Sequence, residues 1–158
     1  MFFVEGVITS VIDDTIAIVS KGKYVHTAIE ILGGTLESLG CVIRDENGQD
    51  IPPGVRLSAL GKYDGRDDVL VKIVDVPNVV AAEETARNLI DIPYGWIDCA
   101  EGGIHDQTGA ALPDDGILTA NCSKTVALVL RAGEVTIDGD VPAGNITPMD
   151  LLNELGGE

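Results

Sequence analysis

The clearest hydrophobic pattern in the chain lies between residues 122 and 132. Consecutive apolar residues, 126–130, follow a polar first turn, and apolar side chains on every face are typical of a buried helix. Asn121, directly before this segment, is a favourable N-cap, and Gly133, directly after it, is a favourable C′ residue. These signals predict a buried helix of about three turns that carries Cys122 in its first turn.

Apolar residues also recur at helical spacing after Asn78, with charged and amide side chains on the opposite side. The apolar positions are Val79, Ala82, Ala86, Leu89 and Ile90. They predict an amphipathic surface helix that ends before Pro93. Residues 13–21 have acids first and lysine last, as the helix dipole favours, and predict a further short helix.

The last helix is predicted from its start signals. Thr147 is suited to the N-cap, Pro148 to the first helical position and Asp150 to the third. The glycine-rich tail at 156–158 is expected to fray, as chain termini often do.

Alternating and β-branched segments predict the strands. Residues 24–32 alternate, Gly33-Gly34 is a turn signal, and residues 35–39 return as the second arm of a hairpin. Shorter strands are expected at 6–9 and 40–44, and residues 55–60 form either a strand or an irregular crossing. The nearly continuous β-branched segment 69–74 predicts a buried strand.

Length and composition favour one α+β domain over residues 1–158, with no internal repeat and no linker. No segment approaches the ~20 apolar residues of a transmembrane helix. No signal peptide is visible at the N-terminus, so we expect a cytoplasmic or virion-associated protein, its oligomeric state left open. With 26 acidic and 10 basic residues the net charge is −16, which disfavours nucleic acid as a partner.

The cysteines, Cys41, Cys99 and Cys122, are odd in number and widely spaced, which is not the pattern of a disulfide framework. With only His26 and His105 besides, no metal site is expected, and no cofactor is expected either. Reduced thiols in a cytosol-like compartment fit this pattern best.

Cys122 is the candidate nucleophile, because the positive end of a helix dipole favours the thiolate. The alternative is a small buried hydrophobic residue. A thiolate enzyme also needs a base and a group that orients the base. His26, at the start of a predicted strand, is the stronger candidate base, whereas His105 lies in a glycine-rich loop. Glu37 on the opposite hairpin arm and Glu30 on the same strand compete as the orienting group.

Several short motifs occur together in a recognisable order. They are Gly6-Val7-Ile8-Thr9, Tyr24-x-His26-Thr27-Ala28-Ile29, Leu36-Glu37, Tyr94-Gly95-Trp96, Asn121-Cys122-Ser123-Lys124-x-Val126-Ala127 and Thr147-Pro148-x-Asp150-Leu151. As a set they resemble the circularly permuted branch of the NlpC-type papain-like cysteine hydrolases, which is related to the lecithin:retinol acyltransferase group. The resemblance implies a permuted papain-like fold, with a central antiparallel sheet or small barrel packed on a buried helix that begins at the cysteine.

The resemblance also implies roles for individual residues. Cys122 would be the nucleophile, His26 the general base and Glu37 the group that orients it. Tyr24 and Tyr94 would line the substrate cleft, and Tyr94 or a backbone amide would assist the Cys122 N–H in stabilising an oxyanion. The expected activity is hydrolysis of an amide or ester through a cysteine thioester, on a peptide, N-acyl or lipid-like substrate.

Two alternatives remain open at this point. The same thioester would serve an acyltransferase, since only the acceptor differs. A non-catalytic binding or structural protein, such as a phage or assembly component, could use the same scaffold. The acidic charge and the missing signal peptide favour this second alternative over a wall hydrolase.

Overall fold

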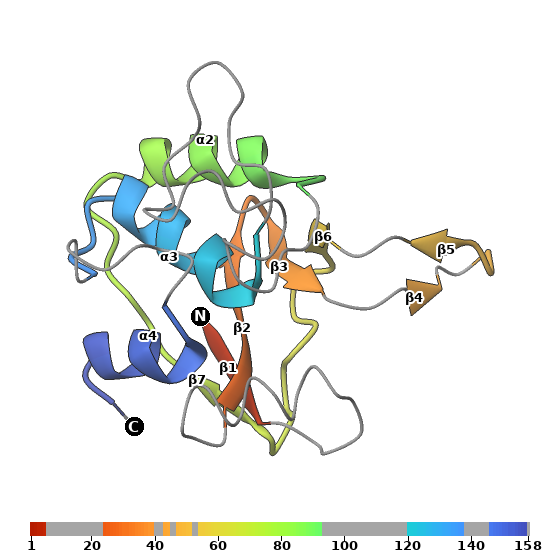
Figure 1. The fold of residues 1–158 in the computed structure, drawn as a ribbon, viewed down its shortest axis with the longest axis horizontal. Helices are drawn as coiled ribbons and strands as arrows, with labels where there is room; N and C mark the ends of the chain where they lie inside the picture. The colour runs from red at the N-terminus through yellow and green to blue at the C-terminus, as the bar shows by residue number, and fades with distance from the viewer. Residues whose placement is uncertain are drawn as a thin grey trace.

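An antiparallel sheet with helices packed on it forms the centre of the computed structural model (Figure 1). The structure describes residues 1–5, 24–39, 43–44, 47–51, 54–92, 120–137 and 146–157. In these residues the main sheet has the strand order β6-β3-β2-β1-β7. Its strands are β1 (Phe2–Glu5), β2 (Tyr24–Ile31), β3 (Gly34–Leu39), β6 (Gly54–Ser58) and β7 (Val69–Val71).

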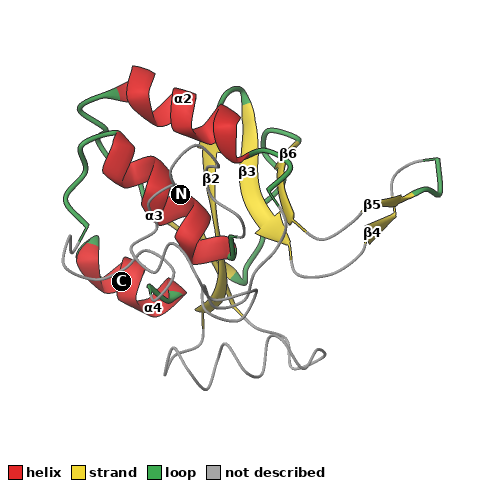
Figure 2. Ribbon diagram, turned by 45° about the horizontal axis from the view of Figure 1, so that its top comes forward, coloured by secondary structure: helices red, strands yellow, loops and turns green. Residues whose placement is uncertain are grey.

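In the described residues, helices α2, α3 and α4 accompany the sheet, and a small hairpin extends from it. The helices are α2 (Val79–Leu89), α3 (Cys122–Ala132) and α4 (Pro148–Glu154). Helix α3 packs against β2 and β3, α4 packs against β2 and α3, and α2 packs on α3 (Figure 2). The strands β4 (Ile43–Arg44) and β5 (Asp50–Ile51) pair with each other in the hairpin that connects β3 to β6. The α+β prediction is therefore confirmed.

The hairpin of β2 and β3 turns one residue earlier than the glycine pair suggests. Leu32 and Gly33 occupy the turn with φ values of 57° and 70°, which are the left-handed values that a two-residue type I′ turn requires. Gly34 instead lies in β3, opposite Ile31. A Cβ at Gly34 would lie 2.6 Å from the carbonyl oxygen of Ser58 on β6, so the second glycine permits close approach of two strands.

Helix α3 is the buried helix that its apolar pattern predicts. Val126, Ala127, Val129 and Leu130 are fully buried. The Asn121 side chain accepts a hydrogen bond from the Lys124 backbone amide at 2.7 Å and caps the helix as expected. Because α3 packs on both arms of the hairpin, its first turn is fixed relative to β2 and β3.

The end of α3 differs from the prediction. Gly133 has φ −76° and is not left-handed, whereas Glu134 takes the positive φ of 66°. A Cβ at Gly133 would clash with Val76 Cγ1 and would lie 3.1 Å from the Ala82 Cβ. Glycine is needed here for the contact between α3 and its neighbours, and not for its conformational freedom.

Substitutions at these two adjacent residues test this explanation of the helix end. Gly133→Ala is expected to lower the free energy of unfolding by about 1–3 kcal/mol, because the methyl group overpacks the contact with Val76. Glu134→Gly is expected to raise it by up to about 1 kcal/mol, because glycine adopts positive φ without strain. Urea denaturation of both variants measures the difference. Equal effects at the two positions would contradict this explanation of the helix end.

One strand prediction is wrong, and another falls outside the described residues. The segment 69–74 was expected to be a buried strand, but β7 is an edge strand in which Val71 is 55% exposed, and Ile73 beyond it is 94% exposed. The first strand is Phe2–Glu5, ahead of the predicted strand at 6–9. That segment and the helix predicted at 13–21 lie outside the described residues.

The other helix predictions agree with the structure. Helix α2 buries Ala82, Ala86 and Leu89, although Val79 in its first turn is exposed. Helix α4 begins with the expected capping box between Thr147 and Asp150. At the start of the tail expected to fray, the backbone amides of Gly156 and Gly157 donate to the carbonyl oxygens of Asn153 and Leu152, which is the Schellman arrangement; Glu158 lies outside the described residues. Of the helices in the described ranges, none is both long and apolar enough to cross a membrane.

Candidate active site

The hairpin brings His26 and Glu37 together. Ile29 pairs with Leu36, and continuing that register sets Glu37 diagonally across from His26. Diagonal neighbours lie within reach of long side chains. His26 Nε2 and Glu37 Oε1 are 2.9 Å apart, and the two side chains are 18% and 0% exposed. Glu30, the competing orienting group, is exposed and lies near the amino group of Met1.

Glu37 is a buried carboxylate with three hydrogen-bond donors. Besides His26, Tyr63 donates its hydroxyl to Oε1 at 2.6 Å, and Lys62 donates from Nζ to Oε2 at 2.5 Å. Burial alone would raise the pKa of Glu37, but the bonds to His26, Lys62 and Tyr63 lower it from 4.5 to about 2. Glu37 is therefore ionised at neutral pH and acts only as an acceptor.

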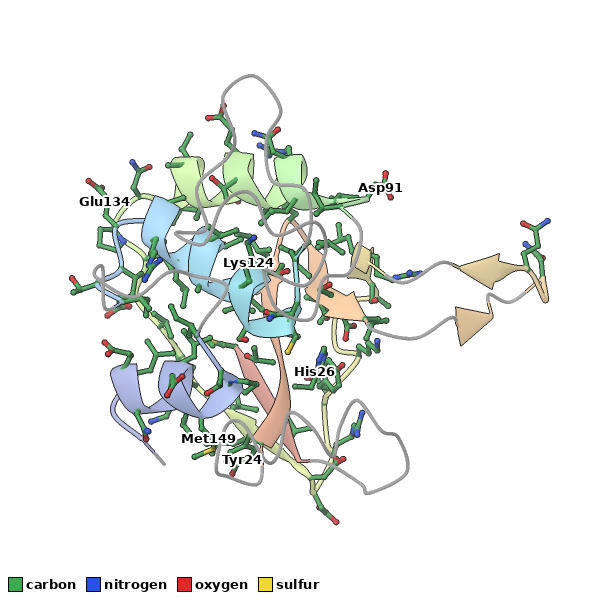
Figure 3. All side chains as sticks on the ribbon, in the orientation of Figure 1. Tyr24, His26, Asp91, Lys124, Glu134 and Met149 are labelled. Carbon is green, nitrogen blue, oxygen red and sulfur yellow. The ribbon has the colours of Figure 1, made fainter. Side chains whose placement is uncertain are left out.

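Cys122 joins this pair from the opposite end of the sequence. It is buried at the first position of α3, and its side chain hydrogen-bonds with that of His26. Two serines fix the start of the helix: Ser38 on β3 donates to the Ala120 carbonyl oxygen at 2.6 Å, and Ser123 donates to the Ile146 carbonyl oxygen at 2.5 Å. In Figure 3 the labelled His26 side chain lies below the first turn of α3, in the part of the structure where β2 meets the helix.

The hydrogen bonds determine which nitrogen of His26 can act as a base. Since ionised Glu37 accepts only, His26 Nε2 must carry a proton in the bond between them. In the neutral imidazole the lone pair is then on Nδ1, the nitrogen that remains for Cys122. Burial would lower the pKa of His26, but its bonds to Cys122 and Glu37, together with their negative charges, raise it from 6.5 to about 9. The His26 ring is therefore positively charged at neutral pH, beside the Cys122 side chain.

Sequence reasoning missed Lys62 and Tyr63. Tyr63 is buried and its ring centroid lies 6.2 Å from that of His26, and burial together with the Glu37 carboxylate raises its pKa. Both residues belong to the turns between β6 and β7, which have no hydrophobic periodicity. An aromatic residue among turn-forming residues, Gly61-Lys62-Tyr63-Asp64-Gly65, is the only signal that could have identified it.

Of the remaining predicted site residues, Tyr24 lies in the described part of the structure, and it is not gathered with this group. Tyr24 on β2 is 4% exposed and packs in the main hydrophobic core, so it offers almost no surface to a substrate. Tyr94, proposed for the cleft and the oxyanion, lies outside the described residues, as do His105, Cys41 and Cys99.

Chemically, the site is an acceptor–imidazole–thiol chain at the start of a buried helix. Across the described part of the chain, no group of three His, Cys, Asp or Glu side chains could hold a metal ion.

The chain was also compared with known proteins and structures. No protein-family model, no curated protein and no solved structure matches it.

Proposed function

We propose that this chain is a thiol hydrolase that acts on an amide or ester, with Cys122 as nucleophile, His26 as general base and Glu37 as the group that orients His26. One observation carries the proposal: His26 hydrogen-bonds through Nε2 to the Glu37 carboxylate and also bonds to the Cys122 side chain. A nucleophile, a base and an orienting acceptor in one chain of hydrogen bonds are the parts that covalent acyl chemistry requires.

The reaction would begin with the thiolate–imidazolium pair. The Cys122 sulfur attacks the substrate carbonyl carbon, and the carbonyl electron pair moves onto oxygen to give a tetrahedral oxyanion. The Cys122 backbone N–H, at the first position of α3, is the expected oxyanion donor, with the helix dipole adding to the stabilisation.

The His26 proton then completes the first half of the reaction. It moves from Nδ1 to the leaving amine or alcohol as the carbonyl–leaving-group bond breaks, and a thioester remains on Cys122. His26, now neutral, takes a proton from water, which attacks the thioester and releases the acid. An acceptor alcohol or amine in place of water would give acyl transfer by the same steps.

The order of these residues along the chain supports the resemblance to the permuted NlpC-type papain-like enzymes. The base and the orienting residue are on an early hairpin, and the nucleophile opens a late buried helix. That is the order expected for the permuted branch, whereas ordinary papain-like enzymes have the cysteine first. The substrate class is proposed as an acyl group on nitrogen or oxygen, from a peptide, N-acyl or lipid-like compound.

Selective alkylation tests the proposal. At pH 7 iodoacetamide is expected to label Cys122 at least about 10-fold faster than Cys41 or Cys99, because the Cys122 side chain bonds to the cationic ring of His26. Peptide mapping by mass spectrometry measures the three rates in the folded protein, and Cys122→Ala serves as the control. A panel of peptidyl, N-acyl and phospholipid electrophiles then identifies the acyl class. Equal or absent labelling of Cys122 would leave only a non-catalytic scaffold.

A further inference from the structure

Both oxygens of the Glu37 carboxylate are held by two consecutive residues of one turn. Tyr63 bonds the oxygen that His26 also bonds, and Lys62 bonds the other oxygen. A glutamate side chain has three rotatable bonds, so a single bond to His26 would leave the carboxylate free to rotate away. Two additional donors on different oxygens remove that freedom.

The turn itself is fixed to the strand that carries Glu37. Thr35 on β3 donates its hydroxyl to the Ala59 carbonyl oxygen at 2.8 Å, directly before the turn. Tyr63 packs with Ala28 on β2 and Val69 on β7, so its ring is fixed on the other side. The two donors are therefore positioned by the sheet, and they do not depend on Glu37 for their location.

We infer that Lys62 and Tyr63 are positioning residues that hold the Glu37 carboxylate ionised and in one orientation, and that share its charge with His26. The inference rests on the proposed role of Glu37 as the group that orients His26. Without these donors, His26 would be the one hydrogen-bond donor left to the buried Glu37 carboxylate among those that the described residues supply. The imidazolium would then hold its proton more tightly and pass it less readily to a leaving group.

Other charged groups around His26 and Glu37 set the size of the effect that Lys62 and Tyr63 have on His26. His26, on β2, faces the titratable groups of Cys122, which lies on α3, and of Glu37, which lies on β3. Arg66, whose guanidinium carbon is 5.2 Å from the Tyr63 ring centroid, interacts with Glu37 but is bonded to Asp68. Arg56 on β6 pairs with Glu37 in the strand register. Besides His26, Lys62 is in direct ion-pair contact with Glu37, and at 32% exposure it supplies its charge without full burial.

The test is an NMR titration of His26 in folded protein labelled with ¹⁵N-histidine, with the signals assigned by His105→Gln. Lys62→Met and Tyr63→Phe are each expected to raise the titration midpoint of His26 by about half to one pH unit, because Glu37 becomes a stronger acceptor for the imidazolium. Lys62→Arg should restore the wild-type midpoint. Lys72→Met, which removes the same charge beyond β7, is the matched control.

The outcomes separate this inference from the proposed function. An unchanged midpoint in a folded variant overturns the assignment of the residue that was replaced, since a structural role alone would change stability and not the titration. If Tyr63→Phe does not fold, the titration midpoint of His26 in Lys62→Met still tests the inference, because Lys62 is partly exposed. Failure of Cys122 to label selectively would refute the hydrolase, whereas the His26 titration needs no activity and would still report on Lys62 and Tyr63.

Discussion

Replacing His26 with alanine is expected to slow alkylation of Cys122 at pH 6 by about 100-fold. An ordinary cysteine titrates near pH 8.5, so less than about 1% of it is thiolate at pH 6. In the wild-type protein the pKa of His26 is raised to about 9, so a cationic ring is bonded to the Cys122 side chain at this pH. The rate of carboxamidomethylation from pH 4 to pH 10 measures the difference.

The other histidine provides the control for this experiment. His105→Ala is expected to leave the Cys122 rate and its pH profile unchanged, because His26 is the ring that bonds the thiol. The wild-type profile should remain high at pH 6, and the His26→Ala profile should rise only towards pH 8–9. A His26→Ala profile that matches the wild type would remove His26 from the proposed mechanism.

Glu37→Gln is expected to lower the free energy of unfolding by about 3 kcal/mol near pH 5.5, because it removes one partner of a buried ion pair. The stabilisation by this pair is lost at both low and high pH. The pKa of Glu37 is lowered from 4.5 to about 2, so its contribution is present above pH 4.5 and lost as the pH falls to about 2. The pKa of His26 is raised from 6.5 to about 9, so its contribution is present below pH 6.5 and lost as the pH rises through about 9.

The difference in the free energy of unfolding between wild type and Glu37→Gln separates the contribution of this pair from that of the other acidic groups, which both proteins share. Urea denaturation at pH 3, 5.5 and 9.5 is expected to give the largest difference at pH 5.5 and smaller differences at the two extremes. Glu30→Gln, which changes the same chemical group on the neighbouring strand, should show no such maximum. A difference that is constant with pH would mean that the ionised pair does not stabilise the fold.

Helices were predictable from the sequence where several local signals agree. For α3 the apolar pattern and the Asn121 cap indicate the same segment, and for α4 the Thr147–Asp150 capping box does so. The end of α3 was not predictable, because Gly133 is required by Val76, which is distant in sequence. The exposure of β7 was not predictable either, since β-branched composition favours a strand without specifying a central or an edge position.

The candidate site was partly predictable for the same reason. His26 and Glu37 are on one hairpin, so strand alternation and a turn signal are enough to suggest their proximity. The choice between Glu37 and Glu30 depends on the register and on side-chain direction, which a one-residue shift of the turn changes. Lys62 and Tyr63 reach Glu37 from a turn without periodicity, and no local pattern encodes that contact.

The placement of these groups along the chain has a consequence for the order of folding. His26 and Glu37 are separated by 11 residues, and a hairpin of this size closes within about 1–10 μs. Cys122 can join them only after a much larger loop closes and α3 packs on the sheet, which is a slower event. During folding the thiol is therefore expected to remain protonated and resistant to oxidation until the core is complete. The proposed reactivity of Cys122 would thus depend on the finished fold.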